Sequence, residues 1–503
     1  MSTSANRPVV FDLGSAYIKC GFAGEASPRY VLASPLGELR AREPPLEPSE
    51  WAMELGALFS ALFFRRLQTR PKDRQVLVCE TGGAGGAGGG AEAAGLREGI
   101  ATALLEQLHV ACVCIAPCGL LALLPSGFTT GVALDVGWRE ARVTAVYDGL
   151  LLRHAARSVG GGAARVQMAL RRRLAAAVAT EEGGEGEGEG EGEGGLPLPP
   201  PTEAELEDMV VRACFVLPRA EAAAAAAAGA ATDGGVAADV RFPAPPGAGT
   251  GTGARVLPGG TRSRVAECLF GEGGEWGGAL DDCHEDGDGL PPPAGNGDDA
   301  AAAATGGEGC CLARALLETL LACPLDTRRA LAQNVVVAGG AAMLPGLCAR
   351  LREEAVAIVA ASKAEEGAAS CLGTYAARYA PLAPLFAPAV LAAGAARGGG
   401  DGSDGVATAA TAAAAAAAAA GTFQVRATQF PRSTLAWLGA SLLGAGGGAR
   451  LEAISLTRAV FRANGGRLRD ACDLRGAALG TDAPLPVNRG LYPKDADEEE
   501  GHA

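Results

Sequence analysis

The sequence FDLGSAYIKCGFAG (residues 11–24) contains two short apolar runs on either side of a glycine-containing turn. Glycines at positions 14, 21 and 24 punctuate the stretch. This pattern predicts two antiparallel strands joined by a tight turn. Because glycine lets backbone N–H groups approach an anion closely, the stretch indicates a phosphate-binding hairpin near the N-terminus.

Outward from this hairpin, short apolar strands alternate with helices. The strands are expected at residues 8–14, 16–24, 74–80, 110–117, 129–137, 141–149 and 334–340. The helices are expected at residues 91–108, 119–127, 203–216, 311–323 and 344–360. Hydrophobic strands interleaved with helices predict an α/β fold with mixed sheets.

Four long segments rich in Ala, Gly, Pro or acidic residues interrupt this alternation. They lie at about 181–200, 220–262, 271–309 and 385–421, in a chain of 503 residues with 74 glycines. Such segments bury too little apolar surface to become ordered, so they are predicted to be disordered loops. The remaining chain, roughly 350 residues, suffices for one large or two medium domains.

The formal net charge of −14 is concentrated in two of these segments. Residues 181–200 contain seven glutamates and residues 271–299 contain nine acidic residues, with no Lys or Arg in either. The rest of the chain is therefore close to neutral. A neutral body lacks the basic patch that nucleic-acid binding or membrane-surface binding requires.

The chain shows neither a secretory leader pattern nor a run of about 18 apolar residues, so it is expected to be soluble and intracellular. Cysteines fit that compartment because they lie in apolar runs, as Cys112, Cys114 and Cys118 do. No C-x-x-C pair and no histidine at metal spacing accompanies these three. They are predicted to be buried reduced thiols rather than metal ligands.

One further glycine motif lies at residues 83–88, which read GAGGAG. It has the G-x-G-x-x-G form of a dinucleotide-binding turn, which also requires an acidic residue after the next strand. The next expected strand, residues 110–117, ends in proline without a carboxylate. The motif is therefore interpreted as a loop enriched in glycine by composition.

Five segments in a fixed order resemble the actin family. FDLGSAYIKCGFAG resembles its first phosphate loop, TTGVALDVGWREARVTAVYDG (129–149) its second, and NVVVAGGAAMLPGL (334–347) its adenosine loop. CPLDTRRALAQ (323–333) resembles the helix before the third loop, and RSTLAWLGASLL (432–443) the closing tryptophan helix.

The resemblance implies two α/β lobes, each around a five-stranded mixed sheet, that close on a nucleotide. The first lobe would comprise residues 1–128, completed by 422–480, and the second residues 129–384. Residues 385–421 would be a low-complexity insert and residues 481–503 a tail.

The resemblance also assigns nucleotide-binding residues. They are Asp12, Gly14, Ser15 and Lys19 in the first loop, Asp135 and Gly137 in the second, and Gly339, Gly340 and Met343 in the third. In the family, the residue matching Asp12 holds a metal through water and the one matching Lys19 is the phosphate cation. A purely structural interpretation stays open, with Asp12 capping its turn, Lys19 a solvated charge, and Gly339 and Gly340 serving loop geometry.

Several positions depart from the family pattern. Trp138 and Arg139 replace an Asp-Gly pair in the second loop. Val210-Val211 replaces a Lys-Glu pair that contacts adenosine in the family, and Ser433 replaces another family lysine. The glutamine and histidine that position the attacking water correspond to Cys118 and Arg142, neither of which can do so. The chain is therefore expected to have no catalytic residues, with ATP or ADP at most a structural ligand.

The segment between residue 24 and the helix expected at 49–64 is short. The family carries about twice as many residues there, including the small subdomain whose loop inserts into the next filament subunit. Without this arm, a subunit would end a filament rather than extend it. The implied partners are subunits of the actin-like filament of dynactin and its other pointed-end subunits, with dynein indirect, in the cytoplasm and cytoskeleton.

Two other classes stay open. A nuclear actin-related scaffold of a chromatin-remodelling complex would also lose ATPase residues, although only Arg171-Arg172-Arg173 approaches a basic import cluster. An active sugar-kinase-like or chaperone-like ATPase is disfavoured by Cys118 and Arg142.

Overall fold

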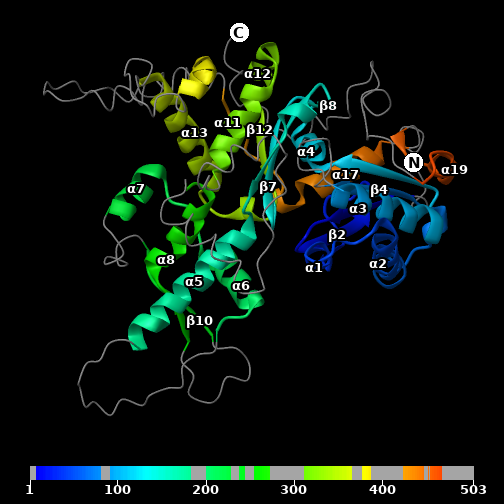
Figure 1. The fold of residues 1–503 in the computed structure, drawn as a ribbon, viewed down its shortest axis with the longest axis horizontal. Coiled ribbons are helices and arrows are strands. Elements are labelled where there is room, and N and C mark those ends of the chain that lie inside the picture. Colours follow the sequence, from blue (N-terminus) through cyan, green and yellow to red (C-terminus); the bar gives the residue numbers. More distant parts are fainter. Residues whose placement is uncertain are drawn as a thin grey trace, which may run out of the picture.

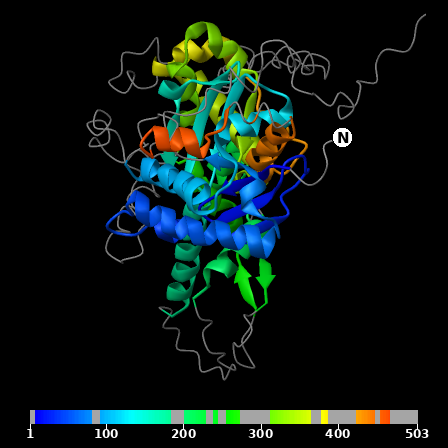
Figure 2. The same cartoon turned by 90° about the vertical axis from the view of Figure 1, so that its right-hand side faces the viewer.

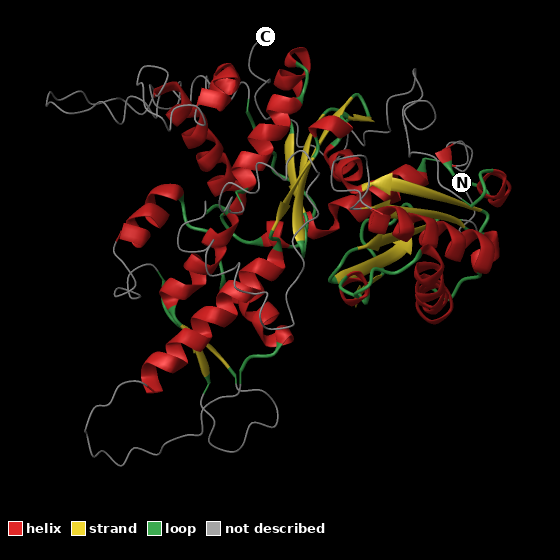
Figure 3. Cartoon of the chain, viewed as in Figure 1, coloured by secondary structure: helices red, strands yellow, loops and turns green. Residues whose placement is uncertain are grey.

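The computed structural model describes residues 7–80, 91–182, 200–227, 237–243, 254–271, 311–364, 377–386, 423–446, 451 and 454–466. It contains two five-stranded sheets, each covered by helices (Figures 1 and 3). The predicted α/β fold with mixed five-stranded sheets is confirmed.

The first sheet has the order β3-β2-β1-β4-β5. Its strands are β1 (Val9–Leu13), β2 (Tyr17–Phe22), β3 (Tyr30–Ala33), β4 (Gln75–Glu80) and β5 (Cys112–Pro117). β1, β2 and β3 pair antiparallel, whereas β1, β4 and β5 pair parallel. The opening hairpin therefore forms as predicted, and β1 lies at the centre of the sheet.

Helices cover both faces of this sheet. Successive side chains of β1 point to opposite faces, and all five residues of this strand are buried. Phe11 packs against Phe59 of α2 (Pro48–Ala61) and Phe63 of η2 (Leu62–Arg66). Apolar side chains of α3 (Ala91–Ala101) and η4 (Thr102–Gln107) belong to the same core. Val10 faces the other way and joins the core formed by α4 (Cys118–Leu123) and α17 (Leu435–Ala445).

The second sheet has the order β12-β6-β7-β8, and β9 also pairs with β7. Its strands are β6 (Gly131–Val136), β7 (Glu140–Tyr147), β8 (Leu150–Leu151), β9 (Arg157–Gly160) and β12 (Val335–Ala338). The helices on one face are α5 (Ala163–Glu182), α6 (Glu203–Ala213), α11 (Leu312–Ala322), α12 (Leu325–Ala332) and α13 (Leu347–Ala364). Their apolar side chains form the larger core of the molecule.

Helices α4 and α17 lie between the two sheets (Figure 1), and Figure 2 views the molecule from the side of the first lobe. Leu121 of α4 packs toward the first sheet, whereas Leu120 and Leu123 pack toward the second. The two helices approach closely at Gly439, where a Cβ atom would lie 1.9 Å from the carbonyl oxygen of Leu121. This pair of helices therefore joins the lobes through a continuous apolar layer.

Residues 25–48 form no separate subdomain. They contain β3, which is the edge strand of the first sheet, and the short helix α1 (Leu36–Arg40). Leu36 and Leu39 of α1 are buried in the core of the first lobe. The segment is therefore folded back onto its own lobe, and in this respect the sequence prediction is confirmed.

The prediction that residues 220–262 are disordered is wrong for the parts that the structure describes. They contain most of α7 (Arg219–Ala227), the hairpin β10 (Val240–Phe242) and β11 (Arg255–Leu257), and α8 (Gly259–Arg264), followed by η7 (Val265–Leu269). Phe242 and Leu257 are buried in the core of the second lobe. Burial of these two apolar side chains therefore holds the hairpin in place, although the segment as a whole is rich in Ala, Gly and Pro.

The other three predicted inserts and the tail lie mostly outside the described residues, as does the glycine motif at 83–88. The remaining described helices include η9 (Ala341–Met343), η11 (Ala377–Leu382), η12 (Arg432–Thr434) and α19 (Arg458–Ala463). Within the described ranges, no helix combines the length and apolar character that crossing a membrane requires.

Candidate functional site

The first predicted phosphate loop joins β1 to β2. Asp12 and Lys19 face each other in the register of the two strands, and Lys19 Nζ donates to Asp12 Oδ2 at 2.7 Å. Burial alone would lower the pKa of Lys19, but the Asp12 carboxylate holds it above its usual value. Lys19 is thus a largely buried cation paired with Asp12, with 15% of its side chain exposed, so its interpretation as a solvated charge is wrong.

The second predicted loop joins β6 to β7. Burial, followed by the nearby Asp12 carboxylate, raises the pKa of Asp135 to about 6. Arg142 lies opposite Asp135 in the strand register, and its Nη2 donates to Glu140 Oε1 at 2.8 Å. Arg142, which the resemblance matches to a water-orienting residue, is therefore a guanidinium paired with a neighbouring carboxylate.

Backbone atoms of this second loop contact the start of α5. The carbonyl oxygens of Gly137 and Trp138 accept from the N–H groups of Ala163 and Ala164, at 2.9 and 3.0 Å. Gly162 permits the approach, since a Cβ atom there would lie 2.1 Å from the Gly137 oxygen. Trp138 is half-buried. The second loop, with Trp138 and Arg139 in place of the family's Asp-Gly pair, is thus hydrogen-bonded to α5 of the second lobe.

The third predicted loop follows β12. Gly339 has a φ of +98°, and a Cβ atom there would lie 2.3 Å from the Val136 oxygen and 2.6 Å from Asp135 Oδ1. Glycine is therefore required for the loop to lie against the second loop. Gly340 has open space around it, and Met343 is about half exposed.

The first and second loops bring three of the predicted side chains close to one another and to Cys118. Asp12, Asp135 and Cys118 all lie within electrostatic reach of Lys19. Cys112, Cys114 and Cys118 are buried and form no disulfide bond, as predicted. In the described part of the chain, no three His, Cys, Asp or Glu side chains cluster as a metal site would require.

Two contacts at the site were not predictable from the sequence. Arg40, at the end of α1, donates from Nη1 to Ser15 Oγ at 3.0 Å. Tyr17 Oη donates to the Glu207 carboxylate of α6, at 2.5 and 2.6 Å from its two oxygens. The second contact joins the lobes across 190 positions of sequence.

The Tyr17–Glu207 contact involves α6, the helix in which Val210-Val211 replaces the residues that contact adenosine in the family. Val210 of α6 is buried in the second lobe, whereas Val211 is exposed. Glu207 precedes Val210 by one turn of α6 and points to the first lobe. Burial and this hydrogen bond raise the pKa of Tyr17 to about 12, so the phenol keeps its proton and donates.

Tyr17→Phe is expected to increase relative motion of the lobes, because it removes the interlobe donor without changing the ring. Hydrogen exchange should become faster in β2 and in α6. Tyr30→Phe is the matched control, since Tyr30 is equally exposed and its hydroxyl makes no described hydrogen bond. Equal exchange in wild type and Tyr17→Phe would contradict the stated role of this contact.

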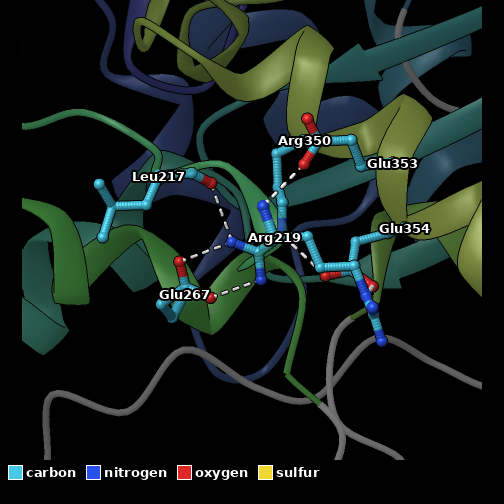
Figure 4. Close-up of polar contacts among 6 residues, drawn as sticks. All are labelled: Leu217, Arg219, Glu267, Arg350, Glu353 and Glu354. Atoms are coloured by element: carbon cyan, nitrogen blue, oxygen red, sulfur yellow. Dashed lines mark hydrogen bonds and ion pairs between the residues drawn. The ribbon is translucent and has the colours of Figure 1, made fainter. Parts of the chain in front are cut away.

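A buried arginine holds the helix that follows the third loop (Figure 4). Arg350 of α13 donates to both oxygens of Glu267, at 3.0 and 2.8 Å, and to Glu354 at 2.7 Å. It also donates to the Leu217 carbonyl at 3.0 Å. Arg219 adds contacts to Glu353 and Glu354. This network connects α13 with η7 and with the segment after α6.

Two lobes with mixed five-stranded sheets, whose loops meet between them, define an actin-like protein. The family model described as Actin matches residues 50–181 and 207–371, which is more than half of the chain. The chain therefore belongs to the actin family. The match includes the second and third loops, whereas the first loop at residues 11–24 lies before it.

Proposed function

We propose that this chain is a non-catalytic actin-related subunit that caps the pointed end of the actin-like filament of dynactin. Within the actin family, ACPLDTRRALAQNVVVAGGAAMLPGLCARL (322–351) and VRACFV (211–216) resemble actin-related protein 10, and this resemblance motivates the proposal. In this role the chain would support dynein-driven transport along microtubules.

The fold of residues 25–48 is the observation that carries this proposal. β3 and α1 return to the first lobe, so this segment provides no projecting arm for the next subunit. A head-to-tail filament grows only if each subunit offers both halves of the contact. A subunit that retains one half binds the end of a filament and stops its growth there.

Affinity purification of the full chain, followed by mass spectrometry, tests this assignment. Filament subunits and pointed-end subunits of dynactin are the expected partners. Recovery of chromatin-remodelling subunits in their place would support the nuclear scaffold and contradict the capping role. The tag can be placed at the C-terminus, beyond the last described residue at position 466.

The second part of the proposal is that the chain does not hydrolyse ATP at a useful rate. Cys118 and Arg142 stand at the positions that orient water, and Arg142 is bonded to Glu140. A permanently charged guanidinium cannot accept a proton from the attacking water. Phosphate release from ATP should match that of a blank without protein, with actin filaments as the positive control. Release at a rate comparable with those filaments would contradict the proposal.

A further inference from the structure

We propose that residues 491–503 of this chain bind an exposed surface of the first lobe that combines basic and apolar side chains. This surface, the α2–η2 patch, comprises Met53, Phe64, Arg65, Arg66, Arg70 and Lys72. The proposal concerns a contact within the chain, and it holds whether or not the chain caps a filament.

The patch carries a local positive charge. Residues 65–74 read RRLQTRPKDR and contain five basic residues and one acidic residue, in a chain whose formal net charge is −14. Arg74 is engaged, because its Nε donates to Thr69 Oγ1 at 2.9 Å and its Nη1 to the Arg7 carbonyl at 3.1 Å. The other four basic side chains are exposed, and within the described residues none of them has an ion-pair partner. The near-neutral average of the chain outside its acidic segments therefore hides a local excess of cations.

Large apolar side chains adjoin these cations. Met53 is 66% exposed and Phe64 is 54% exposed. They are 11 positions apart, which is about three helical turns, so they share a face with the exposed Ala57. A single exposed apolar side chain is ordinary, but here two large ones share a helix face beside four cations. The patch therefore fits a peptide in which apolar side chains adjoin a run of acidic ones.

Residues 491–500 of the chain have this composition. They read LYPKDADEEE, in which two apolar residues, Leu491 and Tyr492, come shortly before five acidic residues. Carboxylates form charge-assisted hydrogen bonds with guanidinium groups, and the Tyr492 ring can pack on the exposed Phe64 ring. The C-terminal segment thus complements the patch in both charge and apolar character.

Helix α19 leads toward this segment from the same end of the first sheet as the patch. Leu456, just before α19, exchanges backbone hydrogen bonds with Val113 at the start of β5, at 3.0 and 2.7 Å. Nearby, the Ala111 N–H donates to the Arg74 carbonyl at 2.9 Å, just before the start of β4. Because β4 and β5 are parallel neighbours, α19 and the loop containing Arg70 and Lys72 lie at the same end of the sheet.

The position and length of the connection favour this occupant over the other acidic segments. Positions 466 and 491 are 25 residues apart. An extended chain of that length spans up to about 80 Å, whereas a folded lobe of about 150 residues is roughly 40 Å across. The acidic segments 181–200 and 271–299 continue from α5 and η7 of the second lobe, and α5 points away from the first lobe (Figure 1). Attachment to the same lobe raises the effective concentration of residues 491–503 at the patch.

Zero-length carbodiimide crosslinking of the untagged full chain, followed by mass spectrometry, tests the proposal. The chain contains four lysines, of which Lys72 alone belongs to the patch. Lys72 should crosslink to carboxyl groups of residues 495–500. In the variant Arg65→Glu/Arg66→Glu/Arg70→Glu, which keeps Lys72, the yield should fall by about fivefold or more, because the charge of the patch is reversed. Its melting temperature should stay close to that of wild type, since the three side chains are exposed.

Arg241→Glu/Arg329→Glu/Arg352→Glu is the matched control, because it makes the same charge change at exposed positions of the second lobe. It should leave the crosslink yield unchanged. The proposal is overturned if Lys72 forms no crosslink to residues 495–500, if it crosslinks to 181–200 or 271–299 in their place, or if both triple variants lose the crosslink equally. Crosslinks formed mainly between chains, in an equal mixture of ¹⁴N- and ¹⁵N-labelled protein, would assign the patch to a second copy and also overturn it.

Discussion

Replacement of Arg350 with alanine is expected to lower the free energy of unfolding by about 3–5 kcal/mol. The Arg350 side chain is 6% exposed and binds Glu267, Glu354 and the Leu217 carbonyl (Figure 4). Truncation leaves the Glu267 and Glu354 carboxylates without their shared cation and leaves the carbonyl without a donor. Since folded domains are stable by about 5–15 kcal/mol, this loss is large.

Urea denaturation followed by circular dichroism measures the effect. Arg352→Ala is the matched control, because Arg352 lies two residues further along α13 and is exposed. Substitutions at such surface positions change stability by about 0.5 kcal/mol or less. Equal midpoints for Arg350→Ala and Arg352→Ala would show that the network does not stabilise the second lobe.

Trp437→Ala is the second substitution with a large expected effect, about 3–5 kcal/mol of destabilisation. Trp437 is fully buried in α17, between the first sheet and α4. Its Nε1 donates to the Val10 carbonyl at 3.3 Å, and a Cβ atom at Gly21 would lie 2.7 Å from its ring. Removal of the indole leaves a large cavity behind β1 and β2.

Trp437→Phe separates the cavity from the loss of the hydrogen bond, since it keeps most of the apolar volume. It should cost clearly less than Trp437→Ala in the same denaturation experiment. Near-identical stabilities of wild type and Trp437→Ala would contradict the packing of α17 on the first sheet, and with it the contribution of residues 435–445 to that lobe.

The sequence predicts the central strands well because their apolar residues are local and periodic. The strand expected at 334–340 is observed as Val335–Ala338, and that expected at 74–80 as Gln75–Glu80. Segment 220–262 shows the limit of an argument from composition. Phe242 and Leu257 order a hairpin there through contacts with the rest of the second lobe, which average composition does not reveal.

The candidate site is predicted only in part for a related reason. Its glycines and charged residues lie in contiguous motifs, so Asp12, Lys19 and Gly339 can be assigned from the resemblance of these motifs to the actin family. The Tyr17–Glu207 and Ser15–Arg40 contacts join separate segments and depend on tertiary packing. Arg350 has no motif of its own, since only the folded chain places Glu267 beside it.

The position of this chain in its complex tests the capping proposal most directly. Electron microscopy of the native complex, purified through the tagged full chain, should show one copy at the pointed end of a short actin-like filament, with no filament subunit beyond it. The face containing β3 and α1 should be free of filament contacts. Copies at interior positions, a copy at the barbed end, or filaments formed by this chain alone would contradict the proposed function.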